Sequence, residues 1–126
     1  MNSKPASLND WTPPADLLKD RVILLTGAAN GIGKAVAIDM AAHGATTVLL
    51  DRDVKGLEQT YDEIVTAGHP QPAIYPMDLQ GAAADDYTQL AATLEKEFNQ
   101  LDGLIHNAAQ LGALVPVANF EHELWF

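Results

Sequence analysis

The sequence predicts an α/β protein built on an open, doubly wound parallel sheet. Short apolar runs alternate along the chain with segments whose apolar residues recur at helical spacing, a pattern typical of parallel strands joined by helices. Connections between such strands are right-handed, which leaves a doubly wound sandwich or a barrel. The chain has room for only four such strands. Because a closed barrel of this type needs eight, the open sheet is favoured.

The first strand and the first helix are predicted at residues 21–27 and 33–44. Residues 21–27, RVILLTG, form a continuous apolar run that ends in glycine, as strands buried on both faces do. Residues 33–44, GKAVAIDMAAHG, carry small and apolar side chains at helical spacing, and Gly44 is suited to ending the helix. The glycine-rich stretch between the two elements therefore follows the carboxyl end of a strand.

The remaining elements repeat this alternation. Strands are predicted at 46–51, TTVLLD, at 73–78, AIYPMD, and at 102–109, DGLIHNAA. The helix between the second and third strands is marked by apolar residues before Gly68, namely Leu57, Tyr61, Ile64 and Val65. The next helix is marked by one apolar face, comprising Tyr87, Leu90, Ala91, Leu94, Phe98 and Leu101.

A doubly wound topology places these four strands in the order 3-2-1-4. The last residues, FEHELWF at 120–126, are predicted to lie inside a fourth helix, so we expect a sheet truncated after strand four and part of the following helix. Strand four then becomes an apolar edge whose unpaired backbone groups favour association. The isolated chain is expected to be marginally stable and to self-associate.

Composition narrows the possible partners and locations. The net charge is −10, from 17 acidic against 7 basic residues, which disfavours nucleic acid and anionic membrane surfaces as partners. Cysteine is absent, which excludes disulfides and thiolate metal sites. The polar start lacks the pattern of a signal peptide, so the cytoplasm is the expected location. Prolines at 5, 13 and 14 predict an extended arm over 1–15, followed by a folded unit over 16–126.

The glycine-rich stretch is the strongest functional signal. Gly27, Gly31 and Gly33 follow a strand and open a helix in the pattern T-G-x-x-x-G-x-G. Missing side chains permit a tight turn and let a pyrophosphate approach the backbone, where the helix N-terminus attracts its charge. The glycines taken by themselves are equally consistent with a tight turn that only packs the helix on the strand. An ATP-binding P-loop is disfavoured because Ala28 and Ala35 stand where that motif needs glycine and a hydroxyl.

Asp51 supports the dinucleotide interpretation. It lies about 20 residues past the loop at the end of the second strand, where an acidic residue accepts hydrogen bonds from the adenosine ribose. An ordinary turn aspartate is the alternative. A carboxylate at the ribose repels a 2′-phosphate, whereas the guanidinium of Arg52 could bind one, so NAD is favoured over NADP only moderately.

These motifs resemble those of the classical short-chain dehydrogenases/reductases, which have a Rossmann-like fold. TGAANGIG at 26–33 fits the family's loop at every fixed position, MDL at 77–79 resembles its third-strand Asp motif, and HNAA at 106–109 resembles its Asn-Asn-Ala-Gly motif. The resemblance implies a partial NAD(P)-binding Rossmann domain and a homo-oligomeric parent. The cofactor-binding residues that it and the spacing imply are Gly27, Asn30, Gly31, Ile32, Gly33, Asp51, Arg52, Asp78, Leu79, Asn107, Ala108 and Ala109.

Two positions depart from the family motif. His106 stands where Asn is common, and Ala109 stands where Gly is usual. Catalysis by His106 is disfavoured, because a histidine at a strand end more often satisfies a local hydrogen bond. The family's Asn at position 107 ties neighbouring strands together. The four histidines lack metal-ligand spacing, so no metal site is predicted.

The family's catalytic residues are missing from the sequence. Hydride transfer in the family relies on a Ser and a Tyr-x-x-x-Lys pair, and none of the three tyrosines here has a lysine four residues later. We therefore interpret the chain as the amino-terminal half of an NAD(P)-dependent oxidoreductase that acts on an alcohol or a carbonyl, inactive by itself. A non-catalytic dinucleotide-binding or interaction module is one alternative, and an incomplete gene product without activity is another.

Overall fold

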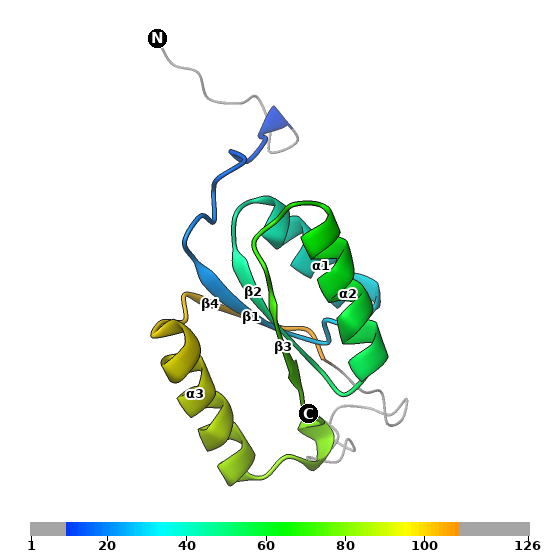
Figure 1. Ribbon diagram of the computed structural model, residues 1–126, viewed down its shortest axis with the longest axis vertical. Coiled ribbons are helices and arrows are strands. Elements are labelled where there is room, and N and C mark those ends of the chain that lie inside the picture. Colours follow the sequence, from blue (N-terminus) through cyan, green and yellow to red (C-terminus); the bar gives the residue numbers. More distant parts are fainter. Residues whose placement is uncertain (1–9, 109–126) are drawn as a thin grey trace, which may run out of the picture.

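The computed structural model describes residues 10–108, which form a parallel sheet between two layers of helices (Figure 1). The strands are β1 (Val22–Thr26), β2 (Thr46–Asp51), β3 (Ala73–Pro76) and β4 (Gly103–His106). The helices are α1 (Gly31–Ala42), α2 (Val54–Thr66) and α3 (Ala84–Phe98), with a 3-10 turn, η2, at Leu79–Gly81. The predicted alternation of strands and helices is confirmed.

The strands lie in the order β3-β2-β1-β4, and all neighbouring pairs are parallel. This confirms the predicted 3-2-1-4 order. Thr26, at the end of β1, pairs with Leu50 of β2 and with His106 of β4. The carboxyl ends of the three strands therefore meet at one edge of the sheet, where an open α/β sheet forms its ligand crevice.

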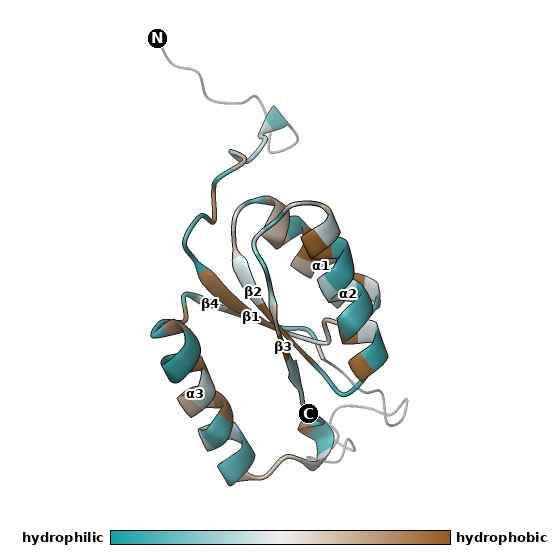
Figure 2. Ribbon diagram, in the orientation of Figure 1, coloured by the Kyte–Doolittle hydropathy of each residue, from teal (hydrophilic) through white to brown (hydrophobic). Residues whose placement is uncertain are grey.

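The two faces of the sheet have separate cores. Helices α1 and α2 cover one face, and α3 lies on the other (Figure 1). Leu25, Leu49, Leu57 and Ile64 are buried on the first face, whereas Leu24, Leu50, Leu90 and Leu94 are buried on the second. All five residues of β1 are buried, which explains its continuous apolar sequence. Figure 2 shows this contrast between the brown ribbon of β1 and the ribbons of α2 and α3, on which teal and brown alternate.

Helix α3 differs in part from its prediction. Leu90 and Leu94 are buried, but Tyr87 and Ala91 are exposed. The helix ends at Phe98 because Asn99 adopts a left-handed conformation with φ of 56°, which reverses the chain toward β4. Leu101 lies beyond the helix and is also exposed, so the interpretation of these residues as one continuous helical face was wrong at its end.

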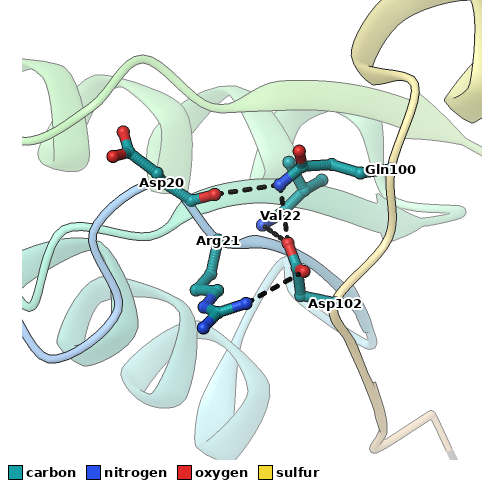
Figure 3. A network of polar contacts seen from close by, with 5 residues as sticks. All are labelled: Asp20, Arg21, Val22, Gln100 and Asp102. Carbon is teal, nitrogen blue, oxygen red and sulfur yellow. Dashed lines mark hydrogen bonds and ion pairs between the residues drawn. The ribbon is translucent and has the colours of Figure 1, made fainter.

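A polar cluster joins the starts of β1 and β4, at the end of the sheet opposite the carboxyl ends (Figure 3). One carboxylate oxygen of Asp102 accepts hydrogen bonds from the backbone N–H of Val22, at 2.8 Å, and from the side-chain amide of Gln100, at 2.7 Å. Arg21 Nη1 lies 3.5 Å from the other oxygen. The bond from Val22 is the main cause that lowers the pKa of Asp102, because it favours the ionised form.

The segment before β1 is tied to the domain by its backbone. Leu18 donates its N–H to the carbonyl oxygen of His43, at 2.9 Å, and its side chain packs on the core of the first face. Trp11 is exposed. The predicted arm over 1–15 lies mostly outside the described residues, as do the predicted fourth helix and Ala109.

Candidate functional site

A cleft of about 560 Å³ opens at the carboxyl ends of the strands. It lies beside the loop between β1 and α1, the loop between β2 and α2, and the segments that follow β3 and β4. Its lining residues are Gly27, Asn30, Gly31, Ile32, Leu50, Asp51, Arg52, Asp53, Met77, Asp78, Leu79, Gln80, Asn107 and Ala108. The cleft is thus assembled from segments that are far apart in the sequence.

The first loop needs glycine at two positions because of its backbone. Gly27 and Gly31 have φ of 70° and 58°, a region that side chains with a Cβ rarely adopt. A Cβ on Gly31 would meet nothing within 4 Å. The requirement for glycine at position 31 therefore comes from its backbone conformation alone. The open space beside Gly31 is part of the cleft.

Gly33 is required for a different reason, namely close packing. A Cβ at this buried position would lie 1.9 Å from the carbonyl oxygen of Gly27 and 2.7 Å from Nδ2 of Asn107. No substitution fits without moving the loop backbone. Gly33 therefore lies behind the cleft, where it holds helix α1 against the loop and does not line the wall.

The N-terminus of α1 faces this cleft through Asn30, Gly31 and Ile32. Asn30 is the N-cap residue, but its side chain makes no capping hydrogen bond, and the first turn holds no acidic residue. By contrast, Asp53 caps α2 by accepting the N–H of Gly56 at 3.1 Å. The first turn of α1 thus presents N–H groups and a positive dipole end, which together attract an anion.

Asp51 bridges the two loops. Its Oδ2 accepts the backbone N–H of Ala29 at 3.1 Å, and its Oδ1 accepts that of Asp53, also at 3.1 Å. Each carboxylate oxygen keeps a further lone pair. The side chain can therefore position both loops and still face the cleft that it lines.

The segment that follows β4 forms a further wall of the cleft, and the buried hydroxyl of Thr26 fixes it. Its Oγ1 accepts the backbone N–H groups of Asn107 and Ala108, at 2.9 and 3.0 Å. Nδ1 of His106 lies 3.5 Å from the same oxygen, at the long end of hydrogen-bond distances. This contact agrees with a local structural role for His106 and connects the end of β4 to the end of β1.

The structure brings together most of the residues that the sequence singled out. Ten of the twelve predicted cofactor-binding residues line the cleft. Gly33 lies behind it, and Ala109 is outside the described residues. Among the large apolar residues that the structure describes, Ile32 is the most exposed, at 74%, which suits an apolar contact with a ligand.

Sequence reasoning missed several residues of the site. Leu50, Asp53, Met77 and Gln80 also line the cleft, and each is a neighbour of a predicted residue. Gly56 and Thr60 of α2 contact the first loop from behind. A glycine in the first turn of a helix and a threonine one turn later were the available signals, but neither belongs to a motif with a known spacing.

The part of the chain that the structure describes holds neither a metal-binding cluster nor a membrane-spanning helix. Residues 10–108 contain no group of three or more His, Asp or Glu side chains placed to hold a metal ion. Within the same range, no helix is long and apolar enough to cross a bilayer.

Comparison with known proteins identifies the family. The family model described as short chain dehydrogenase matches residues 21–126. The chain belongs to the short chain dehydrogenase family. The chain is 36% identical to the uncharacterized oxidoreductase YciK of Escherichia coli K12 over 115 residues. The aligned region covers 91% of this chain and 46% of YciK.

Solved structures agree with the short chain dehydrogenase fold. A short chain dehydrogenase structure from Pseudomonas syringae is 48% identical, with a TM-score of 0.81, over 91% of this chain and 48% of its own. Another from Escherichia coli CFT073, in complex with NADPH, is 38% identical, with a TM-score of 0.79, over 89% and 47%. The chain thus spans about half the length of the relatives that it matches.

Proposed function

We propose that this chain supplies the dinucleotide-binding part of an oxidoreductase that transfers hydride between a nicotinamide cofactor and an alcohol or carbonyl. The observation that carries the proposal is the cleft at the carboxyl ends of the strands, where the glycine-rich loop and the start of α1 meet Asp51, Asp78 and Asn107. Family membership and the NADPH complex of a relative support it. When bound, the cofactor supplies the hydride chemistry.

Each wall of the cleft suits one part of a dinucleotide. The N–H groups at the start of α1, beside Gly31, would hold the pyrophosphate. Asp51 and Arg52 would face the adenosine ribose, and Asp78 with Leu79 would meet the adenine. Asn107 and Ala108 would lie toward the nicotinamide half. In this assignment the chain binds and orients the cofactor and leaves the proton transfer to residues that it does not contain.

We further infer that NADP is preferred over NAD. The sequence by itself favours NAD moderately, through the carboxylate of Asp51. In the structure, however, both oxygens of that carboxylate accept backbone N–H groups, which reduces the negative charge it presents to a 2′-phosphate. Arg52 is exposed, lines the cleft and forms no ion pair with any residue in the range 10–108. A free guanidinium at this position favours a phosphate.

Calorimetric titration of the complete protein with NADP and with NAD tests both points. We expect binding of both, with NADP tighter, and Arg52→Ala should weaken NADP binding by about tenfold, or 1.4 kcal/mol, with little effect on NAD. Lys55→Ala is the matched control, because it removes an exposed positive charge that does not line the cleft. Absence of binding to either cofactor would refute the function, and equal loss in both titrations would refute the role of Arg52.

The activity itself belongs to the complete protein. The 126 residues contain no Tyr-x-x-x-Lys, so we propose that the chain alone turns over no alcohol or carbonyl. Nicotinamide absorbance, followed with a panel of alcohols and ketones, tests this. The choice of substrate, a homo-oligomeric assembly and a cytoplasmic location stay predictions.

A further inference from the structure

Helix α2 supports the glycine-rich loop from the side opposite the cleft. Gly56 and Thr60 are four residues apart in α2 and therefore lie on the same face of the helix. Both are buried, and Thr60 is 0% exposed. Both contact the loop at Ala28 and Ala29, immediately before the residues that open the cleft.

The contact of Thr60 is a hydrogen bond. Its hydroxyl lies 2.9 Å from the carbonyl oxygen of Ala28 and 3.1 Å from that of Gly56. A hydroxyl has one proton to donate, and the carbonyl of Gly56 already has the normal helical partner four residues later. The Ala28 carbonyl is the acceptor outside the helix, and it belongs to a residue that is itself fully buried.

Gly56 contributes close packing between the helix and the loop. A Cβ at this position would lie 2.7 Å from Cβ of Ala29 and 3.0 Å from its carbonyl oxygen. The absence of a side chain lets the helix approach the loop closely enough for Thr60 to reach Ala28. The pair thus combines close approach with one directed bond.

Two further bonds hold the Ala28–Ala29 peptide and the one before it on the β2 side. Ala28 donates its N–H to the carbonyl oxygen of Leu50 at 3.3 Å, and Ala29 donates to Asp51 at 3.1 Å. The peptide planes of the loop are therefore fixed before the chain reaches Asn30 and Gly31, which line the cleft. Removal of the Thr60 bond leaves the Ala28–Ala29 peptide plane held on one side only, by the bond from the Ala29 N–H to Asp51.

We propose that Thr60 is a positioning residue for cofactor binding: its hydroxyl orients the Ala28 peptide and so sets the loop that receives the dinucleotide phosphates. This inference rests on the function proposed above. Thr60 is buried in a helix and does not line the cleft, yet its hydroxyl is expected to affect the affinity of the cleft for the cofactor.

Thr47 provides a matched control within the same chain. It is also a buried threonine at 0% exposure, and its hydroxyl has no hydrogen-bond partner among the described residues. Thr47→Val and Thr60→Val make the same isosteric change at the same depth. Only the second removes a bond to the loop.

The experiment measures cofactor affinity and loop protection in the complete protein. Calorimetry with NADP is combined with hydrogen exchange of the amides of Ala28 and Ala29, read by NMR without cofactor. We expect Thr60→Val to weaken NADP binding about tenfold, equivalent to 1.4 kcal/mol, and to speed exchange at both amides. Thr60→Ser keeps the hydroxyl and should restore both values, whereas Thr47→Val should leave both as in the wild type.

The two readouts separate this inference from the proposed function. If the wild-type protein binds no cofactor, the proposed function fails, and the exchange rates still show whether Thr60 orders the loop. The inference is overturned if Thr60→Val matches Thr47→Val in exchange, or if Thr60→Ser is as impaired as Thr60→Val. Thermal melts by circular dichroism set the temperature at which every variant is folded. If Thr60→Val is unfolded at all temperatures, wild-type values for Thr60→Ala in both readouts overturn the inference, and impaired values support it.

Discussion

At the scale of single residues, the site depends on polar groups that do two tasks. Asp51 was singled out as a ligand for ribose, yet its two oxygens also hold Ala29 and Asp53. Thr26 likewise ends a strand and also receives two N–H groups of the loop after β4. A substitution of Asp51, which lines the cleft, would therefore change loop geometry together with ligand contacts, so glycine positions give the cleaner test of the loop.

Gly33→Ala should abolish cofactor binding and destabilise the fold. The added Cβ would lie 1.9 Å from the Gly27 carbonyl oxygen, so the loop or helix α1 must move, and such overpacking costs about 1–3 kcal/mol. Thermal melts and calorimetry measure the two effects. Gly81→Ala is the control, since a Cβ there would meet nothing within 4 Å. A Gly33→Ala protein that binds NADP with wild-type affinity would contradict the packing argument.

At the scale of elements, β1 and β4 are held together at both ends by side chains. Thr26 and the loop after β4 close the carboxyl end, and Asp102 closes the amino end by accepting the N–H of Val22. The backbone N–H of Asp102 also donates to the carbonyl oxygen of Val22 at 2.8 Å. These contacts fix the register of a strand that has only four residues.

The ionised form of Asp102 should stabilise the fold in a pH-dependent way. Hydrogen bonding lowers its pKa in the folded state, so its contribution is fully present above the unfolded pKa of about 4. It is lost as the pH falls through the lower, folded pKa. Urea titrations at neutral and acidic pH should show Asp102→Asn to be less stable than wild type at neutral pH, with the difference shrinking below about pH 4.

Asp62→Asn, an exposed site on α2, is the control for general charge effects. It should change stability little at either pH. A difference between Asp102→Asn and wild type that stays constant across the same pH range would show that the carboxylate charge is not the stabilising element.

At the scale of the whole molecule, the described sheet has an apolar edge at β4. The strand pairs with β1 on one side, and within residues 10–108 no strand pairs with its other side. Leu104 on this strand is 57% exposed. The exposed backbone groups and side chain together favour association with another chain, or coverage by the remainder of a longer protein.

Leu104→Lys should reduce self-association of the 126-residue chain when it is produced alone. A charged side chain on an edge strand opposes pairing of two edges. Sedimentation velocity should show oligomers for the wild-type chain and a larger monomer fraction for the variant. Leu17→Lys is the matched control, because this leucine is also exposed but lies before β1. A monomeric wild-type chain would remove the basis of the prediction.

The sequence by itself determined the order and type of the elements and most residues of the cleft. Continuous apolar runs such as 22–26 are typical of strands buried on both faces. Glycines such as Gly27 mark a backbone that other residues rarely adopt. The doubly wound topology that such strands favour gives the 3-2-1-4 order, which the structure confirms. Local chemistry and one topological rule were sufficient for these features.

Only the tertiary structure decided which residues share a contact across long separations. The bond from Thr60 to Ala28 and that from Val22 to Asp102 join positions 32 and 80 residues apart. Neither leaves a periodic signal, since each depends on the distance between two packed elements. The end of α3 was also a tertiary outcome, because the left-handed turn at Asn99 brings the chain back to β1. The periodicity of apolar residues predicts which face of a helix or strand is buried. Which residues this face contacts depends on how the elements pack in the tertiary structure.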